Sequence, residues 1–150
     1  MNEKTQAYLR NRVMSATPEQ LRLMLVEGAL RFAHQGRAGI EARNPEQAYE
    51  GIHQCQSILL ELVNSLDHAK APDLCRNLAG LYMFMYRRLI EALLEKDVKP
   101  IDEVIALLEH ERETWVMLMD KLAQERREPA AGSNAANGDE PVVASICVEG

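Results

Sequence analysis

The sequence predicts an all-α protein, in which an antiparallel four-helix bundle follows a short N-terminal helical arm and precedes a disordered C-terminal tail. Two observations lead to this fold class. Apolar residues recur every three or four positions through four long segments, which is the spacing of amphipathic helices. Short connections separate these segments, and short connections favour antiparallel neighbours. The expected units are the arm (1–16), the bundle (17–128) and the acidic tail (129–150).

The composition narrows the classes of protein to consider. The 150 residues suit one domain, and their net charge of -6 includes four acids but no Lys or Arg in residues 128–150. We find no basic patch for nucleic acid, no apolar run of about 18 residues for a membrane span, and no apolar segment after Met1 for a signal peptide. We therefore expect a cytoplasmic protein that neither binds nucleic acid nor inserts into a membrane.

The first bundle helix is expected to begin at Thr17. The Thr17 hydroxyl can accept a free backbone N–H, and Pro18 occupies the first helical position, where no N–H is needed. Gln20 can reach back to complete a capping box. Before this start, residues 3–14 form an amphipathic arm that is too short to be a stable helix alone.

One apolar stripe runs along this first helix until Asn44-Pro45 ends it. Gly28 and Gly36 lie on the stripe, although each glycine costs about 1 kcal/mol relative to alanine in a helix. Their presence predicts the close approach of a neighbouring helix. The stripe consists of Leu21, Met24, Leu25, Gly28, Phe32, Gly36 and Ile40.

The second helix is expected over residues 45–65 and the third from Pro72 or Asp73 to a break at Lys99-Pro100. A loop at 67–72 joins them. Each helix has one apolar stripe. In the second helix the stripe is Ala48, Ile52, Cys55, Leu59, Leu62 and Leu66, and in the third it is Leu74, Leu78, Leu81, Met85, Leu89 and Ala92.

The third helix is apolar over more of its circumference than a surface helix requires. One interpretation makes it the central helix of the bundle. The other makes part of the excess an exposed groove for an amphipathic helix, which the N-terminal arm could cover until a partner displaces it. The excess residues are Tyr82, Met83, Phe84, Tyr86, Ile90 and Leu94, and the groove would use Tyr82, Met83, Tyr86 and Ile90.

The fourth helix is expected from Ile101 to about Arg127, before Pro129. Its inward residues are predicted to be Ile101, Val104, Ile105, Leu108, Trp115, Leu118, Met119 and Leu122. The charged run that contains Glu109, His110, Glu111 and Glu113 is interpreted as a solvated face.

The sequence offers little support for catalysis or for a metal or cofactor. A di-metal carboxylate bundle needs two Glu-x-x-His motifs, and only Glu50 to His53 has this spacing, on a face expected to be solvated. Cys55 and Cys75 fall at apolar helical positions, which predicts buried, reduced thiols, and Cys147 lies in the tail. We therefore expect a protein that is not an enzyme.

Four stretches in order resemble the flagellar secretion chaperone family FliS. They are "AYLRNRVMSATPEQLRLMLVEGALRF", "ILLELVNSLD", "NLAGLYMFMYRRLIEA" and "IDEVIALLEHERETW", which together extend over residues 7 to about 120. The resemblance implies a helical chaperone that binds the disordered C-terminal part of flagellin. It also implies that the chaperone prevents premature polymerisation and helps to deliver flagellin to the export gate protein FlhA.

The resemblance and the excess apolar surface together suggest the residues that carry these roles. Flagellin contacts are expected at Leu21, Met24, Leu25, Ile52, Leu59, Tyr82, Met85 and Leu89. Tyr8 and Val13 of the arm are expected to act as a switch that docks to the gate. The alternative is a generic helical adaptor, or a self-associating bundle such as a homodimer, with a different helical client.

Overall fold

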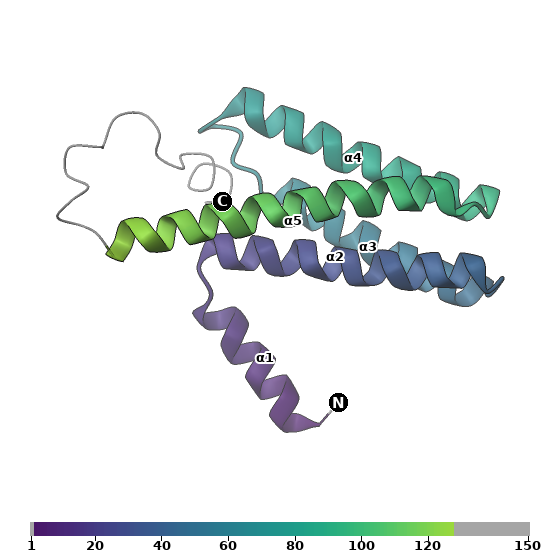
Figure 1. Cartoon of the computed structure of the whole chain (residues 1–150), viewed down its shortest axis with the longest axis horizontal. Helices are drawn as coiled ribbons and strands as arrows, with labels where there is room; N and C mark the ends of the chain where they lie inside the picture. The colour runs from purple at the N-terminus through teal and green to yellow at the C-terminus, as the bar shows by residue number, and fades with distance from the viewer. Residues whose placement is uncertain (1, 128–150) are drawn as a thin grey trace.

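A computed structural model describes residues 2–127 and confirms the all-α fold class (Figure 1). No strand occurs in this range. Predictions about the tail, including Cys147, concern residues outside it. The helices are α1 (Glu3–Ser15), α2 (Pro18–Glu41), α3 (Pro45–Asn64), α4 (Pro72–Glu95) and α5 (Val98–Arg127).

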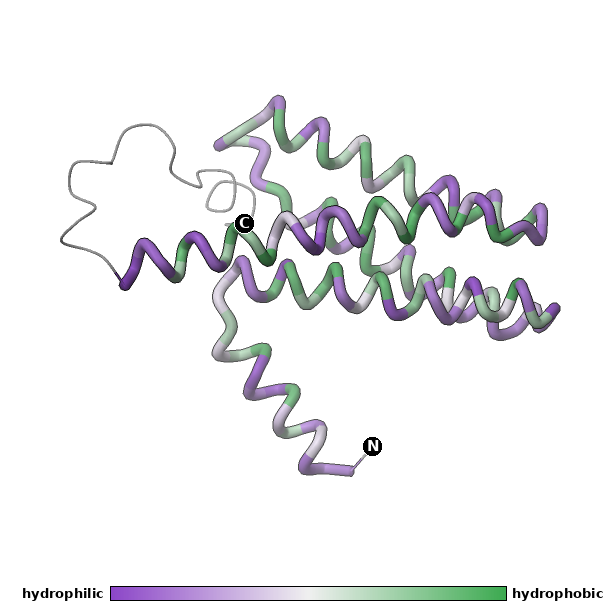
Figure 2. Tube along the Cα trace, viewed as in Figure 1, coloured by the Kyte–Doolittle hydropathy of each residue, from purple (hydrophilic) through white to green (hydrophobic). Residues whose placement is uncertain are grey.

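Helices α2 to α5 form the bundle, and α1 extends away from it (Figure 1). Within the bundle, α2 packs against α3 and α5, and α4 also packs against both of these helices. Consecutive helices run in opposite directions because the connections between them are short. Along each bundle helix, hydrophobic positions alternate with hydrophilic ones, as amphipathic helices require (Figure 2).

The helix starts follow from local side-chain chemistry. At α2, the Thr17 hydroxyl accepts from the Gln20 backbone N–H at 3.2 Å, and the Gln20 side chain accepts from the Thr17 N–H at 2.8 Å. This confirms the predicted capping box. Asn44 caps α3 in a similar way, because its Oδ1 accepts from the Gln47 N–H at 3.2 Å.

The break between α4 and α5 lies earlier than predicted. Helix α4 ends at Glu95, Lys96 adopts a left-handed conformation with φ 55°, and α5 already begins at Val98. Pro100 therefore lies in the first turn of α5, where a missing N–H breaks no helical hydrogen bond. The prediction that Lys99-Pro100 separates the two helices was wrong.

The core lies along the axis of the bundle, where the predicted stripes of α3, α4 and α5 meet. The stripe predicted for α2 was wrong in part, because its large side chains are half-buried and the buried apolar residues of α2 are Val26, Ala29, Leu30 and Ala33. All six predicted residues of the α3 segment are buried, and so are Met85, Leu89 and Ala92 of α4. The first half of α4 packs less deeply, because Leu74, Leu78 and Leu81 remain half-buried. The buried residues of α5 extend from Pro100 to Trp115, and its remaining predicted residues, Leu118, Met119 and Leu122, are half-buried.

Glycines allow α2 and α3 to approach closely. A Cβ atom on Gly51 of α3 would lie 2.3 Å from the backbone nitrogen of Gly36, and one on Gly39 of α2 would lie 2.3 Å from that of Ala48. The predicted role of Gly36 is confirmed. Gly28 also meets a neighbour, the end of the Ile58 side chain, at 3.3 Å. The sequence interpretation missed the two tightest positions, Gly39 and Gly51.

Candidate functional site

The predicted client-contact residues divide into core and surface positions. Five of the eight are at most 1% exposed and belong to the bundle core, namely Ile52, Leu59, Tyr82, Met85 and Leu89. A client on the outside of the bundle cannot touch these side chains, so their expected placement at a surface groove was wrong. Spacing alone had not distinguished core from groove, because both are apolar.

The other three predicted contacts, Leu21, Met24 and Leu25 of α2, are half-buried. Met24 also lines a cleft of about 360 Å³ at the junction of α1, α2 and α5, together with Arg12, Leu23 and Met119. Part of α2 is therefore accessible at the point where the arm leaves the bundle.

Exposed and half-buried apolar side chains recur along α3 and α4. On α4, Met83, Ile90 and Leu94 recur at helical spacing, and Leu94 is 77% exposed. On α3, Tyr49 and Leu60 are exposed. We call the set the α3/α4 apolar face, which comprises Tyr49, Leu60, Met83, Tyr86, Ile90 and Leu94.

A hydrogen bond sets the register of this face. The Gln56 side-chain amide donates to the Tyr86 backbone oxygen at 3.2 Å, so these residues are neighbours on antiparallel helices. By helical geometry, Leu60 then lies near the level of Met83, and Tyr49 near that of Leu94. Of the α4 residues predicted to line an exposed groove, Ile90 is exposed, whereas Met83 and Tyr86 are half-buried. For Tyr82 the prediction was wrong, because its side chain is buried.

The arm is a helix with no buried residue. Its N-cap is Asn2, whose Oδ1 accepts from the Thr5 N–H at 2.8 Å. Tyr8 is 65% exposed and Val13 is 46% exposed, and Leu9 and Met14 are also exposed. Figure 1 shows α1 leaving the bundle at the start of α2 and pointing away from α4, so in this structure the arm does not cover the α3/α4 apolar face.

A buried polar cluster joins all four bundle helices. The Arg22 guanidinium donates to the Tyr82 hydroxyl at 2.8 Å and to the Ser65 hydroxyl at 2.7 Å. The Tyr82 hydroxyl in turn donates to the Glu111 carboxylate, which also accepts from the Trp115 indole at 3.4 Å. Arg22 and Glu111 are therefore linked through Tyr82, and Ser65 follows the last residue of α3.

The electrostatics of the cluster follow from its burial. Burial raises the pKa of Glu111 above its usual value of 4.5, although the Tyr82 hydrogen bond and the Arg22 charge act in the opposite direction. Burial and the neighbouring Glu111 raise the pKa of Tyr82, which stays protonated and can donate. Within residues 2–127, Arg22 Nε and Glu111 Oε2 are buried without a hydrogen-bond partner. The cluster thus contains opposite charges that are only partly satisfied.

The interpretation of Glu111 as part of a solvated face was wrong, and Arg22 was overlooked. Helical spacing could have revealed both. Glu111 lies three residues after Leu108 and four before Trp115, both of them buried, and Arg22 lies four before the buried Val26. A charged residue on an apolar stripe was the available signal.

The remaining candidates from the sequence are the Glu50–His53 pair, the cysteines and a membrane span. Glu50 and His53 are exposed, as predicted, and residues 2–127 contain no cluster of three His, Cys, Asp or Glu side chains that could hold a metal ion. Cys55 and Cys75 are buried, and burial raises the pKa of Cys55 to about 12. None of the helices in this range combines the length and apolarity that crossing a membrane requires.

Comparison with known proteins points to one family. The sequence model described as "Flagellar protein FliS" matches residues 1–122. The flagellar secretion chaperone FliS of Escherichia coli (strain K12) is 36% identical over 118 residues, which cover 74% of this chain and 85% of that protein. Its counterpart in Salmonella typhimurium (strain LT2) is 34% identical, with 81% and 92% covered. The counterpart in Bacillus subtilis (strain 168) is 31% identical, with 80% and 89% covered.

These matches extend over the arm and nearly the whole bundle, and they agree with the helical architecture and with the stretches that resembled the family. The chain belongs to the FliS family of flagellar secretion chaperones.

Proposed function

We propose that this protein is a cytosolic export chaperone that binds the disordered C-terminal region of flagellin, prevents its premature polymerisation and aids its delivery to the export gate protein FlhA. Family membership supports the general role, because the relatives are named flagellar secretion chaperones. A site made of apolar side chains is also suited to binding a partner rather than to catalysis.

The observation that carries the proposal is the exposed α3/α4 apolar face. An amphipathic segment that folds on binding needs a long apolar surface on which to bury its own apolar residues. Methionine and tyrosine suit such a surface, because methionine adapts to varied side chains and tyrosine keeps a polar end. The face provides Met83, Tyr49 and Tyr86 beside Ile90 and Leu94.

Half-buried residues of α2 extend the proposed contact region. Leu21, Met24 and Leu25 stay predicted flagellin contacts, and Met24 is accessible at the junction cleft. In this proposal the five predicted contacts that lie in the core act indirectly, because they hold the helices that present the surface.

The double variant Ile90→Glu/Leu94→Glu tests the placement of the client. Both residues are exposed in the free chain, at 39% and 77%, so the bundle should fold normally. A bound apolar segment would bury the new carboxylates without partners, which is costly. We expect the Kd for a C-terminal flagellin peptide to rise by about tenfold or more, measured by isothermal titration calorimetry.

A matched control is Met117→Glu on α5, which introduces a carboxylate at an apolar residue that is 72% exposed but lies outside the α3/α4 apolar face. Its affinity should remain close to that of the unaltered protein. Equal affinities for the double variant and the control would show that the client binds elsewhere.

The variant Tyr8→Ala tests the proposed gate contact. Tyr8 and Val13 point away from the core on a helix that has no buried residue, which leaves them available to a partner. We expect Tyr8→Ala to leave flagellin binding unchanged and to weaken the binding of the loaded complex to the cytoplasmic domain of FlhA. The measurement is a titration of that domain, with Asn11→Ala as a polar control on the same helix. Gate binding that survives the loss of Tyr8 undiminished would remove Tyr8 from the contact.

A further inference from the structure

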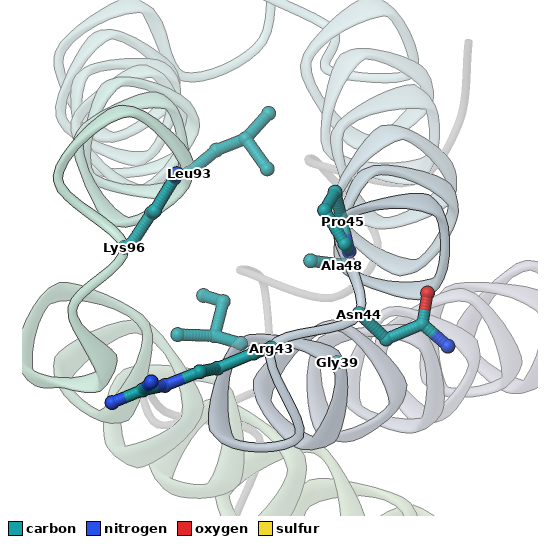
Figure 3. A pocket seen from close by; sticks show the side chains of 8 residues that line it. Gly39, Arg43, Asn44, Pro45, Ala48, Leu93 and Lys96 are labelled. Atoms are coloured by element: carbon teal, nitrogen blue, oxygen red, sulfur yellow. The ribbon is translucent and has the colours of Figure 1, made fainter.

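A second candidate site lies at the end of the bundle opposite to α1. A cavity of about 460 Å³ opens there, where α2 and α4 end and α3 begins (Figure 3). Ile40, Ala48 and Leu93 give it an apolar lining, and Arg43 and Lys96 add two cationic side chains. In Figure 3, Lys96 lies across the opening from Pro45 and Ala48, and the Arg43 side chain runs along the lower edge with its guanidinium directed outward.

The two cations occupy unusual backbone positions. Arg43 has φ 54° and Lys96 has φ 55°, and these are the non-glycine residues with positive φ in the described part of the chain. Glycine or asparagine ordinarily fills such a position after a helix, because a side chain with a Cβ is strained there. A cation near the C-terminus of a helix interacts favourably with the helix dipole. That interaction alone would not place the Arg43 and Lys96 side chains at the same cavity.

Both charges are also available to a ligand. Neither side chain makes a hydrogen bond or ion pair with another residue in the range 2–127. The neighbouring acids Glu95 and Asp97 do not line the cavity, and the Asn44 side chain is already used to cap α3. An anion could therefore bind without displacing an existing partner.

We propose that this cavity binds an organic carboxylate joined to a short apolar body. The volume falls within the range of small-ligand pockets. The carboxylate would lie at the rim of the cavity and pair with the long side chains of Arg43 and Lys96, since charge-assisted hydrogen bonds to such groups are strong. The apolar body would contact Ile40, Ala48 and Leu93. Two sources share this chemistry, namely a medium-chain fatty acid and an acidic side chain flanked by apolar residues in a peptide.

The test is a titration of the ¹⁵N-labelled full chain followed by NMR. The probes are octanoate and the peptide acetyl-Leu-Glu-Leu-amide, with acetate as a carboxylate that lacks the apolar body. We expect at least one of the two amphiphilic probes to shift the backbone amides of Gly39, Arg43, Ala48 and Leu93. Acetate at the same concentration should produce no comparable shift.

The variant Arg43→Asn/Lys96→Asn separates binding from folding. Asparagine tolerates the left-handed conformation, so this variant should fold while it loses both charges. We expect its affinity for the bound probe to fall by about tenfold or more. The control Lys4→Gln/Arg10→Gln changes the net charge equally on α1, and its affinity should not change.

Each outcome decides the proposal. Shifts with octanoate alone assign the site to fatty acids, and shifts with the peptide alone assign it to an acidic protein segment. Shifts with both support the shared chemistry. The proposal is overturned if neither probe shifts the cavity amides, if the shifts concentrate on the α3/α4 apolar face instead, or if the folded Asn variant binds as tightly as the unaltered protein.

Discussion

Replacing Gly51 by alanine should lower the free energy of unfolding by about 2–3 kcal/mol and lower the Tm by roughly 10 °C. The added Cβ would lie 2.3 Å from the Gly36 nitrogen and 2.7 Å from the Phe32 oxygen. These are backbone atoms of α2, so no side chain can rotate away, and the two helices must separate. That separation would loosen the packing of Ile52 of α3 against α2. Thermal unfolding followed by circular dichroism measures the change.

Gly80→Ala is the matched control. A Cβ at Gly80 of α4 would meet nothing within 4 Å, so only the intrinsic helix preference changes. We expect this substitution to stabilise the protein by about 0.5–1 kcal/mol. A Gly51→Ala variant as stable as the unaltered protein would show that α2 and α3 are not in the close contact described.

Arg22→Ala should destabilise the protein by about 3–5 kcal/mol at neutral pH, because it leaves Glu111 as a buried carboxylate without a cation nearby. It also removes the donors to the Tyr82 and Ser65 hydroxyls. Arg31→Ala, which truncates an exposed arginine on the same helix, should change the stability far less. Urea denaturation at several pH values measures both variants.

The destabilisation caused by Arg22→Ala should depend on pH in a definite direction. The pKa of Glu111 is raised on folding, so its proton binds more tightly to the folded chain. Its contribution to stability is therefore fully present below its unfolded pKa and is lost as the pH rises through the folded pKa. Losing Arg22 raises this pKa further, so the destabilisation by Arg22→Ala should be smaller at pH 5 than at pH 8. A loss that is equal at both values would contradict the coupling of these two residues.

Local chemistry explains how much of the fold could be predicted. The capping box at Thr17 and Gln20 depends only on residues three positions apart, and the stripe through Ile52, Cys55 and Leu59 depends only on helical spacing. Short connections then determine the antiparallel arrangement. Each of these signals lies within one helix or one loop, so the sequence contains it directly.

The features that were missed depend on two helices at once. Tyr82 lies off the predicted apolar line of α4, but its hydroxyl is satisfied by Arg22 and Glu111 from two other helices, which makes burial possible. The tight contact at Gly51 likewise depends on where α2 crosses α3. The same limit applies to the α3/α4 apolar face, because spacing shows that α4 is widely apolar but not which part its neighbours cover.

The most direct test of the proposed function is a calorimetric titration of the full chain with a C-terminal flagellin peptide from the same cell. Burial of an apolar segment that folds as it binds predicts a tight complex with a large negative heat-capacity change, obtained from titrations at several temperatures. The absence of binding by a folded, monodisperse sample would contradict flagellin as the client of this chaperone.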